Sequence, residues 1–136
     1  MRRYALARNY VNLPRPETFE TPENYYAVAF HELTHSTGHE SRLNRAGVAG
    51  SRLAAFGSAD YSREELVAEM GSAFLCAEAG IESTLDNSAA YLKGWLRALK
   101  GDARLIVTAA SAAQRAADFI LNRNAQGIIE GEPESE

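Results

Sequence analysis

The sequence predicts an α+β domain that is mainly helical and carries a small N-terminal β-sheet or hairpin. Its 136 residues are enough for one hydrophobic core, and its 46% hydrophobic and 24% charged content is that of an ordinary globular protein. Residues that favour strands are concentrated before the first prolines, and four later segments carry apolar residues at helical spacing. We therefore assign residues 1–124 to one folded domain and expect the acidic residues 125–136 to form a disordered tail.

The N-terminal part of the sequence predicts one or two short strands followed by a helix. Residues 2–13 contain Tyr, Leu and Val at strand-like spacing before prolines interrupt them, which predicts one or two short strands. Thr21 followed by Pro22 is typical of a helix start, because Thr21 can cap free amides and Pro22 needs no amide partner. We expect this helix to run to about residue 37 and to stop at Gly38 in a left-handed conformation.

A long loop and a second helix follow. Residues 38–61 are rich in Gly, Ser and Arg without sustained periodicity, which predicts a loop. Ser62 and Glu65 match the capping-box pattern, so the second helix is predicted to open at Ser62 and to end near Gly80. The hydrophobic positions within it recur at helical spacing.

Two more helices complete the predicted domain. The third covers about residues 87–100, has its apolar residues on one side and stops at Gly101. The fourth begins with Asp102 as its cap and runs to about Asn122 with an alanine-rich stripe.

Charge and cysteine content narrow the function classes. The net charge of −4 comes from four glutamates in the last seven residues, so the rest has no basic surplus of the kind typical of nucleic-acid binding proteins. The longest uncharged apolar run, residues 105–113, is too short to span a membrane, and no secretory signal is recognisable. The single Cys76 excludes an intramolecular disulfide and a multi-cysteine metal site, and together these features favour a cytoplasmic location.

The first helix contains the sequence His31-Glu32-Leu33-Thr34-His35. Residues four apart lie on one helical face, so His31 and His35 can both bind one zinc ion. Glu32 lies about 100° around the helix, from where its carboxylate can take a proton from a zinc-bound water. The alternative, a chance occurrence in a plain helical bundle, predicts no bound metal.

A third metal ligand is needed, and two routes are open. His39 is two residues early for the pattern that uses a third histidine, because Ser41 stands at that position. A glutamate on the following helix is the other route, and we prefer Glu65, with Glu69 and Glu64 as weaker candidates. An acid one turn further on, such as Glu69, can accept the outer N–H of a ligand histidine. Glu65 could instead serve only the capping box.

Several further residues with possible chemistry are interpreted as structural. Tyrosines near the helices are more often packed than catalytic, loop arginines are commonly solvated, and a cysteine on an apolar helix stripe is usually buried. These residues are Tyr25, Tyr26, Tyr61, Arg42, Arg45, Arg52 and Cys76.

Beyond single motifs, much of the chain resembles a known family. Residues 30–39, 41–45 and 64–76 together look like the C-terminal zincin-like metallopeptidase domain of ArdC-type antirestriction proteins, and residues 91–96 and 108–114 agree with it. The resemblance covers about residues 20–122. It implies a gluzincin-like fold, encoded on mobile genetic elements.

The resemblance also implies roles for individual residues. It places zinc on His31 and His35, the general base on Glu32 and the third ligand in the segment 65–69, where we choose Glu65. The resemblance further implies that single-stranded DNA would be bound only through an N-terminal domain, which we expect to be separate from residues 1–136. We expect a protein or peptide as the substrate.

The resulting hypothesis is a zinc metallopeptidase that hydrolyses peptide bonds with Glu32 as general base. The alternative is a non-proteolytic antirestriction interaction module in which the metal is structural. Zinc is the default ion for two histidines and a glutamate, although cobalt, nickel or manganese can replace it.

Overall fold

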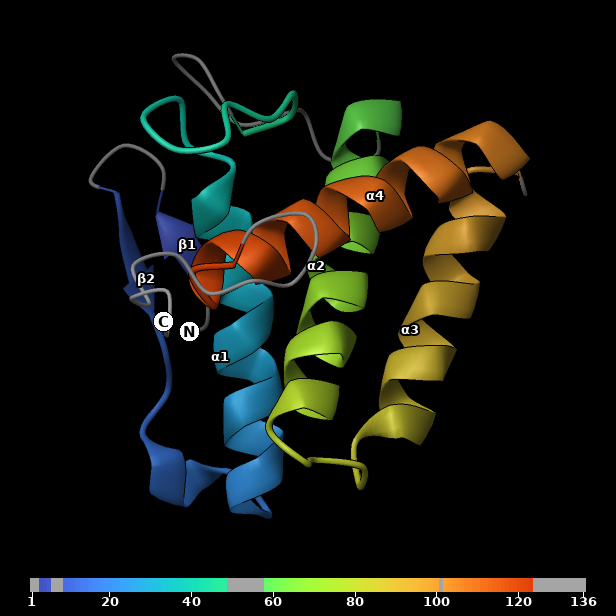
Figure 1. The fold of residues 1–136 in the computed structure, drawn as a ribbon. Helices are drawn as coiled ribbons and strands as arrows, with labels where there is room; N and C mark the ends of the chain where they lie inside the picture. Colours follow the sequence, from blue (N-terminus) through green and yellow to red (C-terminus); the bar gives the residue numbers. More distant parts are fainter. Residues whose placement is uncertain (1–2, 6–8, 49–57, 101, 124–136) are drawn as a thin grey trace, which may run out of the picture.

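The computed structural model describes residues 3–5, 9–48, 58–100 and 102–123, and the predicted α+β class is confirmed (Figure 1). In chain order the elements are β1 (Arg3–Ala5), β2 (Tyr10–Asn12), the short 3-10 helix η1 (Pro16–Thr18), α1 (Pro22–Thr37), α2 (Ala59–Glu78), α3 (Leu85–Ala98) and α4 (Ala103–Ile120). None of the helices in these ranges is both long enough and apolar enough to cross a membrane. The predicted tail, residues 125–136, and Arg52 lie outside the described residues.

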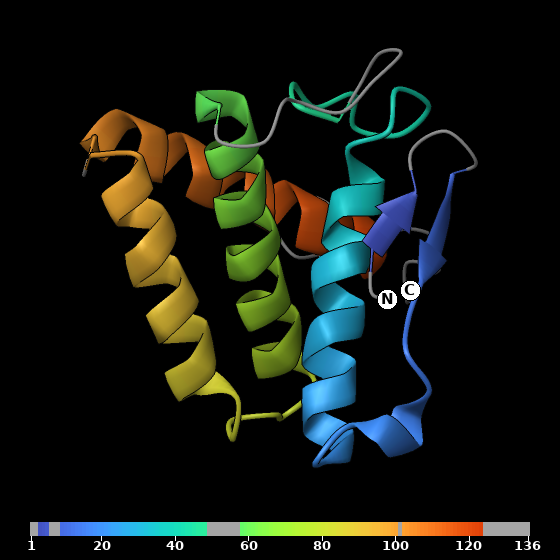
Figure 2. The ribbon, with the colours of Figure 1, turned by 180° about the vertical axis from the view of Figure 1, so that it is seen from behind.

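The helices α1, α2 and α3 stand side by side, and α4 crosses α2 obliquely, as the opposite views of Figures 1 and 2 show. The main core lies where α2, α3 and α4 meet. Its buried members are Leu66, Val67, Leu99, Ala109, Ala112 and Ala113. The alanines of α4 let this helix approach α2 closely, and burying the apolar face of α2 there leaves its other side directed towards α1.

The strands β1 and β2 form the predicted antiparallel hairpin, with Tyr4 opposite Val11. The hairpin contacts α1, and Tyr4 is buried. Its hydroxyl donates to Oδ1 of Asn9, 2.7 Å away. The position of β1 beside α1 matters for the site described below.

The predicted bounds of α1 are confirmed, but the reason for its end is different. The Thr21 side chain accepts from the Asn24 amide at 3.2 Å, as a cap should. The prediction of a left-handed Gly38 is wrong, because its φ and ψ are −77° and −8°. A Cβ at Gly38 would lie 2.9 Å from atoms of Arg45 and Val48, so glycine allows the following loop to pack against the helix end.

The predicted start of α2 at Ser62 is wrong. The helix begins one turn earlier, at Ala59, and Ser58 caps it by accepting from the Tyr61 amide at 3.1 Å. Ser62 is therefore a buried residue within the helix, and Glu65 is free of any capping role. The end of α2 next to Gly80, whose φ is +75°, agrees with the prediction.

The later helices agree with the prediction to within about two residues at each end. The Asp102 side chain accepts from the Arg104 amide at 2.9 Å and caps α4 as predicted. Of the predicted loop over residues 38–61, residues 38–48 form turns and the last residues belong to α2. Residues 49–57 lie outside the described ranges.

Candidate metal centre

Two histidine rings project from α1 towards α2. His31 and His35 are one helical turn apart, and their Nε2 atoms lie 3.2 Å from each other. The rings meet at 81° with their centroids 4.8 Å apart. His31 is only 4% exposed, so these polar groups are held inside the protein at a high cost unless partners face them.

The Glu65 carboxylate on α2 faces both histidines. Its Oε2 lies 3.2 Å from Nε2 of His31, and its Oε1 lies 3.2 Å from Nε2 of His35. Among the described residues, these three side chains form a group that could hold a metal ion. Ligands at about 2.0–2.1 Å from a tetrahedral ion are separated by about 3.3 Å, so the observed triangle suits a metal.

The outer nitrogen of His35 faces a second carboxylate. Its Nδ1 lies 2.6 Å from Oε2 of Glu64, and the Arg45 guanidinium donates to Oε1 and Oε2 of Glu64 at 2.6 and 3.1 Å. Arg45 also donates to the Thr34 carbonyl at 2.8 Å. The interpretation of Arg45 as a solvated loop residue is wrong, because the turn after α1 folds back and delivers it to the site with its side chain 10% exposed.

The outer nitrogen of His31 faces a third carboxylate. Its Nδ1 is buried and lies 2.8 Å from Oε1 of Glu69, although the angle there is not that of a hydrogen bond. Glu69 is one turn after Glu65 on α2. Glu64 and Glu69 therefore both face outer histidine nitrogens, a position from which carboxylates orient metal-binding imidazoles.

Glu32 lies beside the same group but is held by the hairpin. Its Oε2 accepts from the Tyr4 amide of β1 at 2.7 Å, and its Oε1 lies 4.0 Å from Nε2 of His31. The residue is 5% exposed. A strand far away in sequence thus fixes the carboxylate next to the point on which His31, His35 and Glu65 converge.

Comparison with known proteins identifies the family of this arrangement. A profile described as zincin-like metallopeptidase matches residues 2–112. The chain belongs to the zincin-like metallopeptidase family. The resemblance and the zincin-like fold expected from the sequence are thereby confirmed.

Solved structures and a curated relative agree with the assignment to the zincin-like family. The antirestriction protein ArdC of plasmid R388, with Mn(II) bound, is 45% identical, with a TM-score of 0.68 over 88% of this chain and 43% of that one. Its metal-free structure gives 43% identity and a TM-score of 0.67, covering 90% and 42%. An Escherichia coli DNA primase TraC is 41% identical over 118 residues, which are 87% of this chain and 11% of that protein. The chain thus spans less than half of these proteins.

The charges of this zincin-like centre favour a proton on the histidines when no metal is bound. Burial alone would lower the pKa of His35, but Glu64 and Glu65 outweigh it and raise this pKa to about 10. Burial likewise opposes a charge on His31, yet Glu65 and Glu69 raise its pKa. Burial would raise the pKa values of Glu64 and Glu65, but the facing histidines lower both, and Arg45 lowers that of Glu64 further.

Other candidate residues of the zincin-like domain lie away from the group formed by His31, His35 and Glu65. Nδ1 of His39 contacts the Ser41 hydroxyl at 2.7 Å, and His39 does not belong to the convergent group. Arg42 donates to the Ser36 carbonyl at 2.7 Å, so its interpretation as a solvated residue is also wrong. Cys76 is buried as expected.

The three tyrosines pack against aromatic neighbours. Tyr25 meets Phe19 edge-on with ring centroids 5.5 Å apart, and Tyr26 meets Tyr25 at 5.3 Å. The Tyr61 ring meets Trp95 at 5.6 Å. Burial, with a smaller contribution from the negative charge of Glu65, raises the pKa of Tyr61.

Proposed function

We propose that this zincin-like domain is a zinc-dependent peptidase that hydrolyses peptide bonds in a protein or peptide substrate. The observation that carries the proposal is the triangle of His31, His35 and Glu65 with Glu32 fixed beside it. His31, His35 and Glu65 would hold the ion. When bound, zinc polarises a substrate carbonyl and lowers the pKa of water to about 7.

Glu32 is suited to act as the general base. The Tyr4 amide occupies its Oε2, which leaves Oε1, on the side of His31, to accept a proton from the attacking water. The same carboxyl group can then pass this proton to the leaving amine. Because β1 holds the carboxylate in place, little reorganisation is needed when the proton moves.

Glu64 and Glu69 support the ligands from outside. A metal-binding imidazole must keep its proton on the outer nitrogen, and a carboxylate that accepts from that nitrogen fixes this tautomer. Nδ1 of His35 has this arrangement with Glu64, and Oε1 of Glu69 lies 2.8 Å from Nδ1 of His31, near enough to take the same role once the two groups are aligned. We propose zinc because two histidines and one carboxylate match its preference and because zinc binds such sites more tightly than Mn(II) does, although ArdC of R388 was crystallised with Mn(II).

The test compares wild type with Glu32→Gln after zinc loading. We expect one zinc per chain in both proteins and a loss of about 10²–10⁴-fold in peptide cleavage in the variant. Glu82→Gln, which changes an exposed acid outside the site, is the matched control and should cleave like wild type. Unchanged cleavage in Glu32→Gln would overturn the assigned base. A zinc-loaded wild type that cleaves no peptide in a diverse library would instead favour the interaction module.

A further inference from the structure

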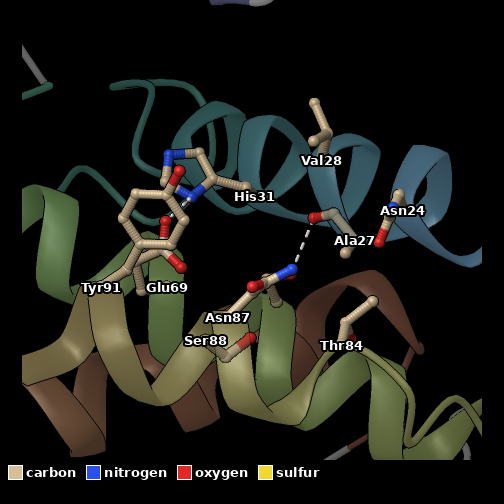
Figure 3. A pocket seen from close by; sticks show the side chains of 10 residues that line it. Asn24, Ala27, Val28, His31, Glu69, Thr84, Asn87, Ser88 and Tyr91 are labelled. Carbon is tan, nitrogen blue, oxygen red and sulfur yellow. Dashed lines mark hydrogen bonds and ion pairs between the residues drawn. The ribbon is translucent and has the colours of Figure 1, made fainter. Parts of the chain in front are cut away.

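A cavity of about 150 Å³ opens next to the metal centre, between α1, α2 and α3 (Figure 3). His31, Glu69 and Tyr91 lie towards one end of it, and Asn24 and Thr84 lie towards the other. His31 is therefore shared, with its Nε2 facing the metal donors and its ring lining the cavity. Whatever occupies this cavity lies directly beside a substrate held at the metal.

Within the part of the chain that the structure describes, one buried hydroxyl group in the wall of the cavity has no hydrogen-bond partner. Thr84 is 3% exposed, and its Oγ1 forms no hydrogen bond with any described residue. It precedes α3 as the capping residue, yet its side chain makes no capping bond. A buried polar group without a partner costs about 1–3 kcal/mol, so a ligand that supplies a hydrogen bond here is favoured.

The remaining walls also favour an uncharged, hydrogen-bonding occupant. Asn24 on α1 and Asn87 on α3 carry amide groups that both donate and accept, and Ser88 adds an almost buried hydroxyl. Among the described residues that line the cavity there is no lysine or arginine, and the one carboxylate, that of Glu69, already faces His31. A cation would lack a free partner, a carboxylate would meet Glu69, and an apolar side chain would leave the hydroxyls unsatisfied.

We propose that this cavity is the subsite for an asparagine or glutamine side chain of the peptide substrate, next to the bond that is cleaved. The primary amide of such a side chain offers two donors and two acceptor positions, which match the mixed lining. Because the cavity shares His31 with the metal centre, the side chain belongs to a residue adjacent to the scissile bond or one position further. This inference rests on the proposed peptidase function.

The first experiment measures cleavage of peptides that differ only at that residue. We expect kcat/KM to be at least about tenfold higher for Gln or Asn than for Met, Leu, Glu or Lys. Thr84→Val keeps the shape and removes the hydroxyl, so it should reduce the preference for the amide over Met without reducing folding stability. Thr108→Val, at an exposed position on α4, is the control and should keep the preference. Cleavage without an amide preference, or an unchanged preference in Thr84→Val, would overturn the subsite and leave the peptidase proposal intact.

A second experiment does not depend on turnover. Zinc-loaded Glu32→Gln is titrated with a Gln-containing peptide and its Met counterpart while the backbone NMR signals of residues 84–91 are followed. We expect shifts there with the Gln peptide and binding at least about fivefold weaker with the Met peptide, as for one lost hydrogen bond. If wild type cleaves no peptide but this binding occurs, the peptidase proposal fails, and the cavity stands only as a site that binds a primary amide, with no scissile bond beside it. Equal binding of both peptides, or shifts confined to other residues, would overturn the subsite.

Discussion

Arg45 holds both carboxylate oxygens of Glu64, at 2.6 and 3.1 Å, and Glu64 in turn contacts Nδ1 of His35 at 2.6 Å. The turn after α1 is thereby tied to α2 through the same carboxylate that orients a proposed metal ligand. All three side chains are largely buried, with Glu64 at 6% and Arg45 at 10% exposure. The stability of the fold and the geometry of the site depend on one chain of contacts.

Arg45→Met is expected to destabilise the metal-free protein by about 1–3 kcal/mol, because the buried Glu64 carboxylate loses two hydrogen bonds and, among the described residues, keeps only His35 as a cationic partner. Chemical denaturation measures this loss. The double variant Arg45→Met with Glu64→Gln should recover part of it, since the buried carboxylate charge that Arg45 offset is then gone. Arg104→Met removes a 94% exposed arginine near Asp102 and should change stability by less than about 0.5 kcal/mol. Equal effects of the two arginine variants would contradict the buried role of Arg45.

Glu65→Gln and Glu69→Gln should weaken metal binding to different degrees. Glu65 faces the inner nitrogens of both histidines. The metal affinity of Glu65→Gln is therefore expected to be more than about 100-fold lower than that of wild type. Glu69 faces only the outer nitrogen of His31, so the metal affinity of Glu69→Gln should be about 10–100-fold lower than that of wild type. Competition with a chelator of known affinity measures both constants. A larger loss in Glu69→Gln than in Glu65→Gln would transfer the ligand role to Glu69.

Metal binding should release protons and strengthen as the pH rises. The pKa of His35 is raised from 6.5 to about 10, so protonated His35 stabilises the metal-free fold below pH 6.5, and this contribution is lost as the pH rises through about 10. A metal requires the neutral ring, so its affinity must rise across the same window. Calorimetry at pH 7 in two buffers of different ionisation enthalpy should show at least one proton released per zinc. Binding without proton release would contradict the prediction.

Gly71 sets the approach of α2 to α1. A Cβ at this position would lie 2.6 Å from Oγ1 and Cγ2 of the buried Thr34, so Gly71→Ala should cost about 1–3 kcal/mol through overpacking. Combining it with Thr34→Ala removes the clashing atoms and should be less harmful than the sum of the two single changes. Gly94→Ala on α3 meets nothing within 4 Å and should instead stabilise by about 0.5–1 kcal/mol. Thermal denaturation of the variants compares these effects.

Local sequence signals predicted each of the α-helices, but they placed the start of α2 at the wrong serine. Thr21 before Pro22 and Asp102 before α4 were sufficient because each cap lies at a clear change from loop to helical pattern. Ser62 was misleading because Ser58, four residues earlier, is also a good cap, and the capping-box pattern does not tell which serine is used. Arg45 could not be assigned from sequence, since its partner lies 19 residues away on another element.

The sequence by itself determined that His31 and His35 share one face of a helix, because their spacing is that of a helical turn, and it identified the family. It did not decide which of Glu64, Glu65 and Glu69 faces the Nε2 atoms of both histidines. These acids point in different directions from α2, and their roles depend on how that helix is rotated and how closely it packs against α1. That packing is set by Gly71 against Thr34 and by the burial of the opposite face of α2 under α4, which are contacts between distant segments.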